Sequence, residues 1–161
     1  MDCKFVSVIV PAHNEERYIS QCLQSLAAQD YPKYQYEVIV VDNNSTDKTS
    51  EIAAGFGVKI VQQGSGPVGA VRNAGASIAK GELLAFIDAD CIAPTNWLTQ
   101  GARALASDRA VYGGGNDLRP TPHWIEKAWL LESKAPPKNF WAAAFLLRSP
   151  ISLTLADSMR K

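Results

Sequence analysis

Two aspartates separated by one residue, Asp88 and Asp90, end the run LLAFIDAD at residues 83–90. The five apolar residues before them are typical of a strand that is buried on both faces. Ionised carboxylates are costly to bury, so we expect both aspartates to lie where the strand emerges, at its C-terminal end. In open parallel sheets this edge binds ligands. Two oxygen donors there suit Mg²⁺ or Mn²⁺ held together with the phosphates of a substrate.

A third aspartate, Asp42, ends another apolar strand-like run at residues 36–41. The turn that follows makes it typical of a simple turn with a helix cap. Asp88 and Asp90 also have a simpler interpretation, as a strand end and a cap, which their spacing alone does not exclude. Strand-end aspartates of one parallel sheet would face the same crevice, however, and this favours a shared functional site.

The elements that must position these residues alternate along the chain. Apolar periodicity predicts strands at residues 5–10, 36–41, 58–62, 83–87 and about 109–112, and helices at 15–28, from 45 or 46 to about 54, at 68–79 and at 96–106. We expect Asn14 to cap the first helix and Ser45 or Thr46 the second. The alternation predicts an α/β, Rossmann-like fold with a mainly parallel sheet and helices on both faces. Beyond residue 120 it predicts a helix at 123–132 and a second apolar run at 140–147.

The composition is that of one globular domain. The chain has 161 residues, and its 16 basic and 16 acidic side chains cancel, which gives no indication of nucleic-acid binding. Three cysteines without a C-x-x-C pair argue against a disulfide scaffold or a zinc site. The start does not read as a signal peptide, and the apolar runs are too short to span a bilayer. We therefore expect a cytoplasmic protein.

A glycine-rich segment offers a competing interpretation. Residues 64–69, GSGPVG, form a literal G-x-G-x-x-G after a strand and before a helix, with Asp88 about twenty residues on, as in dinucleotide-binding proteins. Against this, Pro67 removes an N–H where a pyrophosphate needs donors, and two strand–helix units precede the motif. Arg72, on the following helix, is a natural phosphate partner, although alone it could belong to a solvated helix face. His13 and His123 are isolated, and we interpret them as loop or surface residues.

Four segments occur in order in matching strand and helix contexts: VSVIVPAHNEE at 6–16, VIVVDNNSTDKT at 38–49, VGAVRNAG at 68–75 and LLAFIDAD at 83–90. Together they resemble the family 2 glycosyltransferases, which have the GT-A fold. The resemblance covers about residues 5–120. It implies that residues 1–120 form a nucleotide-sugar donor-binding domain and that 121–161 are an incomplete acceptor-side segment of the same domain.

The resemblance also implies a set of site residues and a reaction. By position, the nucleoside contacts are Pro11, Ala12 and Glu15, and the base-binding aspartate is Asp42. Arg72 is the arginine of the family's A-R-N-x-G segment. Asp88 and Asp90 form the D-x-D motif, in which Asp90 is the more direct metal ligand and Asp88 lies nearer the ribose. The implied donor is a nucleotide-diphosphate sugar, with UDP as the expected nucleotide, and the acceptor is a carbohydrate or a lipid-linked molecule. The implied reaction is a displacement with inversion, in which Mg²⁺ or Mn²⁺ and Arg72 stabilise the departing diphosphate.

The C-terminal part departs from the family pattern. No Glu-Asp pair follows Asp90, and Asp117, Glu132 and Asp157 lie in no matching context, so the general base stays unknown. We therefore expect a truncated or frame-shifted form, whose apolar stretch at 124–147 would contact a second copy, a membrane surface or a partner. Two alternatives stay open: a donor-binding module without turnover, and an NAD(P)-dependent oxidoreductase.

Overall fold

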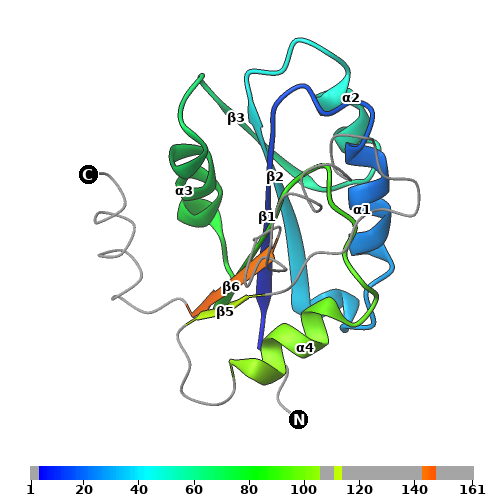
Figure 1. The fold of residues 1–161 in the computed structure, drawn as a ribbon, viewed down its shortest axis with the longest axis vertical. Coiled ribbons are helices and arrows are strands. Elements are labelled where there is room, and N and C mark those ends of the chain that lie inside the picture. The colour runs from blue at the N-terminus through cyan, green and yellow to red at the C-terminus, as the bar shows by residue number, and fades with distance from the viewer. Residues whose placement is uncertain (1–3, 106–110, 114–142, 148–161) are drawn as a thin grey trace, which may run out of the picture.

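A computed structural model describes residues 4–105, 111–113 and 143–147 of the chain. Its centre is a six-stranded sheet with the order β3-β2-β1-β4-β6-β5 (Figure 1). The first four strands along the chain are parallel to one another, and β6 pairs antiparallel with β4 and β5. The strands are β1 (Val6–Ala12), β2 (Tyr36–Asn43), β3 (Lys59–Gln63), β4 (Leu83–Ile87), β5 (Val111–Gly113) and β6 (Ala143–Leu147).

Helices cover both faces of the sheet, as Figure 1 shows with α3 on one side and α1 and α2 on the other. The helices are α1 (Ile19–Ala27), α2 (Thr49–Ala54), α3 (Val68–Ile78) and α4 (Trp97–Ala104), with a 3₁₀ turn, η1, at Lys33–Gln35. The core has two parts, one on each face of the sheet, because successive strand residues point to opposite faces. Val6, Val8 and Val10 of β1 pack toward α1 and α4, whereas Ile9 packs toward α3. This arrangement confirms the predicted α/β fold.

Close packing of α3 against the sheet depends on Gly75. A Cβ atom at this position would lie 2.6 Å from Cγ2 of Ile9 and 2.9 Å from Cγ2 of Val41. Real Cβ atoms essentially never approach other atoms so closely, so only glycine lets the helix sit at this distance. The close approach fixes where the helix holds Arg72, one turn before Gly75, relative to the sheet edge.

Two predicted helix starts are wrong. The first helix begins at Ile19, and Tyr18 is its N-cap residue, because Asn14 has a left-handed φ of 56° and its side chain bonds to another loop. The second begins at Thr49, after Lys48, and neither Ser45 nor Thr46 caps it. In both places the polar residues satisfy partners in the opposite loop, which local sequence signals do not reveal.

The remaining predicted elements agree with the structure to within a few residues. The predicted helix at 123–132 and most of the predicted segment at 121–161 lie outside the described residues, apart from β6, which falls within the predicted apolar run and pairs with β4. No helix in the described ranges is long and apolar enough to cross a membrane.

Candidate functional site

An open pocket of about 440 Å³ lies at the C-terminal edge of β1, β2 and β4. Side chains from three strand ends and from α3 line it, because parallel strands present these ends at one edge of the sheet. The described lining residues are Pro11, Ala12, His13, Glu15, Asn43, Val68, Val71, Arg72, Asp88, Ala89 and Asp90. The pocket thus brings together six of the seven predicted site residues: Pro11, Ala12, Glu15, Arg72, Asp88 and Asp90.

Asp42 is the exception, and the expectation that it shares this crevice is wrong. Its side chain is buried, with the residue 2% exposed, and it is absent from the described lining of the pocket. One carboxylate oxygen accepts the Ser45 N–H at 3.0 Å, and the other accepts the Ser50 hydroxyl. Successive strand residues point to opposite faces, so Asn43 lines the pocket in its place. The predicted contact of Asp42 with a nucleoside base stays a prediction.

The surroundings of Asp42 keep its carboxylate ionised. Burial alone would raise the pKa of Asp42, but hydrogen bonds from Ser45, Ser50 and Gln62 outweigh it and lower the pKa below its ordinary value. Hydrogen bonding to the charged form has this effect. Asp42 therefore anchors the start of the β2–α2 loop, because it accepts hydrogen bonds from the Ser45 amide and the Ser50 hydroxyl.

Arg72 and Asp88 form an ion pair inside the pocket. Nη2 of Arg72 donates to Oδ1 of Asp88 at 2.8 Å, and the two side chains are 36% and 39% exposed. Nε of Arg72 is buried and has no hydrogen-bond partner among the described residues. The guanidinium therefore retains unused donor capacity beside the carboxylates, and this capacity suits an anionic ligand with several oxygens.

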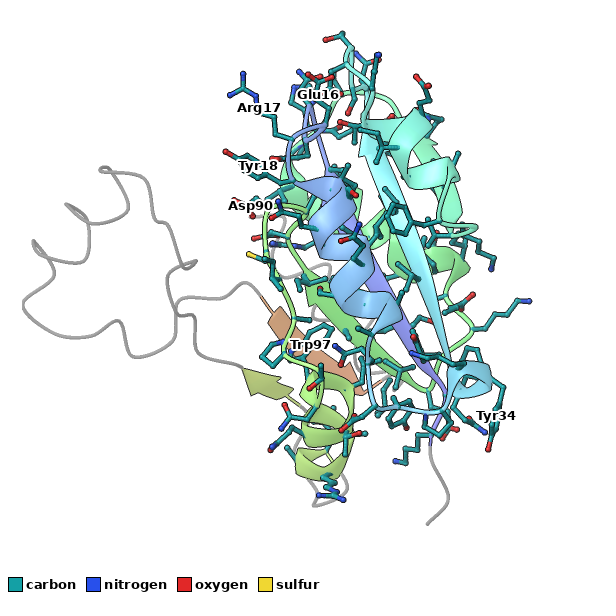
Figure 2. The ribbon with its side chains drawn as sticks, turned by 90° about the vertical axis from the view of Figure 1, so that its right-hand side faces the viewer. Glu16, Arg17, Tyr18, Tyr34, Asp90 and Trp97 are labelled. Atoms are coloured by element: carbon teal, nitrogen blue, oxygen red, sulfur yellow. The ribbon has the colours of Figure 1, made fainter. Side chains whose placement is uncertain are left out.

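Asp90 is exposed, and Figure 2 shows it toward the N-terminal end of α1, at the opposite end of the molecule from Tyr34. The Cys91 thiol, which is a weak donor, bonds to it, with Sγ of Cys91 3.4 Å from Oδ1 of Asp90. Nearby, burial and the negative charges of Asp90, Asp47 and Asp88 raise the pKa of Glu15, and His13 partly opposes them. Negative charge thus accumulates at this end of the pocket, where a cation would reduce the repulsion.

The described residues do not form a complete metal site. Within the described ranges, no group of three or more His, Cys, Asp or Glu side chains is arranged to hold a metal ion. Asp90 presents a carboxylate to solvent, whereas Asp88 already faces Arg72. Carboxylate oxygens suit Mg²⁺ or Mn²⁺, but a cation here would need further oxygens from a ligand or from water. The residues therefore fit a cation that is shared with a bound phosphate group.

Helix α1 holds the segment that follows the two aspartates. Burial raises the pKa of the Cys22 thiol to about 12, so it stays protonated, and its Sγ lies 3.7 Å from the Asp88 carbonyl oxygen. Ser25 accepts the Ala93 N–H at 3.0 Å. The buried Gln29 donates to the Pro94 carbonyl at 2.7 Å and accepts the Leu98 N–H at 3.0 Å, which satisfies a free amide at the start of α4.

Two polar lining residues, His13 and Asn43, are missing from the predicted site. Nδ1 of His13 lies 2.7 Å from the carbonyl oxygen of Asn43, which can only accept, so this nitrogen carries a proton. The Asn43 side chain bridges the backbone of Gly66, because Oδ1 accepts the Gly66 N–H at 3.1 Å and Nδ2 donates to its carbonyl at 3.2 Å. The alternation within β2 could have identified Asn43, but its link to Gly66 depends on the tertiary structure.

Comparison with known proteins assigns the chain to a family. The family model described as glycosyl transferase family 2 matches residues 7–121. The chain belongs to this family. Glycosyltransferase AglE of Haloferax volcanii is 41% identical over 121 residues, which are 70% of this chain and 39% of AglE. The Staphylococcus aureus protein TarS, a poly(ribitol-phosphate) beta-N-acetylglucosaminyltransferase, is 43% identical over 90 residues, or 52% of this chain and 16% of TarS.

Solved structures agree with this family. A crystal structure of S. aureus TarS 1-349 in complex with UDP-GlcNAc superposes with a TM-score of 0.63 and 35% identity, covering 74% of this chain and 37% of that one. The mannosyltransferase PcManGT of Pyrobaculum calidifontis has a TM-score of 0.70 over 94% of this chain and 46% of that one; at 24% identity it shows the shared fold alone. The family 2 chain described here spans less than half the length of each of these relatives.

Family membership and geometry together explain the GSGPVG segment. In a dinucleotide-binding loop, backbone N–H groups must be free to face a pyrophosphate. Here the Gly66 N–H donates to Asn43, and Pro67 has no N–H. In this family 2 chain the segment is therefore a braced connection between β3 and α3, and the oxidoreductase alternative finds no support in it.

Proposed function

We propose that this chain is the donor-binding part of an inverting glycosyltransferase, which transfers a sugar from a UDP-sugar to an acceptor hydroxyl with the help of Mg²⁺ or Mn²⁺. The observation that carries the proposal is the pocket itself, which gathers Arg72, Asp88 and Asp90 together with Asn43 and His13. The crystal structure of the TarS relative with UDP-GlcNAc supports the choice of nucleotide.

We assign the diphosphate to the part of the pocket that Arg72 lines. Its guanidinium is held by Asp88 and has a buried, unpaired Nε, so it can supply positive charge to a departing diphosphate without first being ordered. When bound, the cation would neutralise further charge on the diphosphate, with Asp90 as its main protein ligand and Asp88 beside it. Asp88 thereby acts on the reaction largely through the position of Arg72.

We assign the nucleoside base to the part of the pocket that Asn43 lines. After its two bonds to Gly66, the Asn43 amide keeps one N–H and one oxygen lone pair. A uracil edge offers a carbonyl oxygen and an N–H, and either one complements one of these two remaining groups. Because Asp42 is buried and bonded to Ser45 and Ser50, we propose that Asn43 makes the base contact and that Asp42 supports it from behind.

The choice of acceptor rests on the family resemblance and the place of the protein in the cell on its composition, and no residue is assigned as the general base. We propose a carbohydrate or lipid-linked acceptor, and a cytoplasmic location in which the C-terminal apolar run contacts a membrane or a second copy. A donor-binding module without turnover is the second candidate. Both candidates require the same pocket, and they separate when sugar transfer or donor hydrolysis is measured.

The decisive experiment is calorimetric titration of UDP with and without Mn²⁺. We expect Mn²⁺ to increase UDP affinity and Asp90→Ala to abolish that increase, a loss of about tenfold or more, or about 1.4 kcal/mol. Glu82→Ala is a matched control, because Glu82 is an exposed carboxylate at the other end of β4. If Asp90→Ala binds UDP in Mn²⁺ as tightly as the unmodified protein, the metal assignment is wrong; if no nucleoside diphosphate binds, the proposed function fails.

A further inference from the structure

One wall of the pocket lacks apolar packing of its own. The β1–α1 loop, residues 13–18, supplies His13 and Glu15 to the pocket, yet all of its side chains are exposed or half-buried. A loop without buried apolar side chains has little burial energy to define its conformation. Its hydrogen bonds must therefore hold His13 and Glu15 where the pocket needs them.

Those hydrogen bonds come from residues 43–49, which are the β2–α2 loop together with the last residue of β2 and the first residue of α2. Seven of them join the two loops. Of this second loop only Asn43 lines the described pocket, so most of its polar groups face the first loop and not a ligand. Such an arrangement is typical of a support for a binding wall.

Asn14 makes the central link of this contact. Its N–H donates to Oγ of Ser45 at 2.9 Å, and its Oδ1 accepts the Thr46 N–H at 2.8 Å. Ser45 in turn donates its own N–H to the buried Asp42. Asn14 has a φ of 56°, a left-handed conformation that asparagine tolerates better than most residues. The position thus requires both an unusual backbone and a side-chain acceptor.

Thr49 makes a second link and reaches a pocket residue directly. Its buried Oγ1 accepts the Glu15 N–H at 2.7 Å and donates to Asp47, and the other Asp47 oxygen accepts the Glu16 N–H at 3.1 Å. Desolvation works to raise the pKa of Asp47, but the bonds from Thr49 and Glu16 lower it, so this acceptor stays charged at neutral pH.

We propose that the β2–α2 loop is a template that holds the β1–α1 wall in its ligand-binding conformation, with Asn14 and Thr49 as positioning residues for the nucleotide. The proposal rests on the proposed function in so far as the nucleotide is UDP. Neither residue lines the described pocket, so each would act on affinity through Glu15 and His13. These bonds lie wholly within the protein, so they preorganise the wall, and binding does not have to order it.

The test compares paired variants with UDP in Mn²⁺ as the probe. Thr49→Val removes the hydroxyl with little change in shape, and Thr49→Ser restores it. Asn14→Gly keeps the left-handed backbone and removes the acceptor, and Asn14→Asp keeps both. We expect Thr49→Val and Asn14→Gly to weaken UDP binding about tenfold, the factor that corresponds to about 1.4 kcal/mol, and the Ser and Asp variants to stay near the original affinity.

Amide hydrogen exchange without ligand separates positioning from general destabilisation. In Thr49→Val we expect faster exchange at the Glu15 and Glu16 amides and unchanged exchange at the β1 amides. Unchanged exchange at Glu15, or faster exchange with unchanged UDP affinity, would overturn the template. If the unmodified protein binds no UDP, the proposed function fails, and the exchange result still decides whether Thr49 holds the wall.

Discussion

Asp42 and Asp88 lie near the C-terminal ends of two strands and have opposite surroundings. Asp42 is the next-to-last residue of β2, Asp88 directly follows β4, and the two strands flank β1 in the sheet. Asp42 is buried and bonds to the neutral Ser45 N–H and the Ser50 hydroxyl, whereas the side chain of Asp88 is 39% exposed and pairs with Arg72. Asp42 organises the β2–α2 loop, and Asp88 orients the Arg72 guanidinium in the pocket. A strand-end aspartate is therefore not a ligand contact by position alone, because the pleat decides which face it meets.

The largest expected effect tests the role of Asp42 as a structural anchor. Asp42→Ala leaves the Ser45 N–H and the Ser50 hydroxyl without their acceptor at a buried site. We expect the free energy of unfolding to fall by about 2–3 kcal/mol, measured by urea denaturation. Asp42→Asn, which keeps one acceptor oxygen, should lose less. A loss under about 0.5 kcal/mol in Asp42→Ala, the range of ordinary surface substitutions, would show that Asp42 is not an anchor.

The next effect concerns binding. Asp88→Asn weakens the hold on Arg72 in a half-exposed pair, so the free energy of unfolding should change by less than about 1 kcal/mol. UDP affinity in Mn²⁺ should fall about tenfold, measured by calorimetry. Glu37→Gln is the matched control, because Glu37 forms the other described ion pair, with Lys59, away from the pocket. Equal effects of the two variants on affinity would contradict a specific role for Asp88.

The smallest effect is that of pH on stability. Burial would raise the pKa values of Asp42 and Glu37, but hydrogen bonds lower both below their ordinary values of 3.8 and 4.5. A folded-state pKa below the unfolded value gives stability that is complete above the unfolded pKa and is lost as pH falls through the folded one. The urea midpoint should therefore decrease below about pH 4.

Asp42→Asn removes one of these titrations, so its urea midpoint should decrease less steeply in acid than that of the unmodified protein. A parallel decrease in the Asp42→Asn variant would show that Asp42 contributes no pH-dependent stability.

The sequence by itself determined the α/β fold, the order of the elements and six of the pocket residues. Apolar runs of strand length alternate with amphipathic stretches, and parallel strands must present their C-terminal ends at one edge. The positions of Asp88, Asp90 and Pro11 at that edge therefore follow from where each apolar run ends. Local signals failed at the helix starts, where Asn14 and Ser45 resemble caps but bond across loops.

Only the tertiary structure decided which polar side chains enter the pocket and which support it. The pairing of Arg72 with Asp88, the bridge from Asn43 to Gly66 and the contact of Thr49 with Glu15 join residues that lie 16 to 34 positions apart. Hydrogen bonds at such separations depend on the pleat of β2, the left-handed turn at Asn14 and the close approach of α3 at Gly75. The turn at Asn14 and the approach of α3 are not encoded in a local pattern, because each depends on where a neighbouring element is packed.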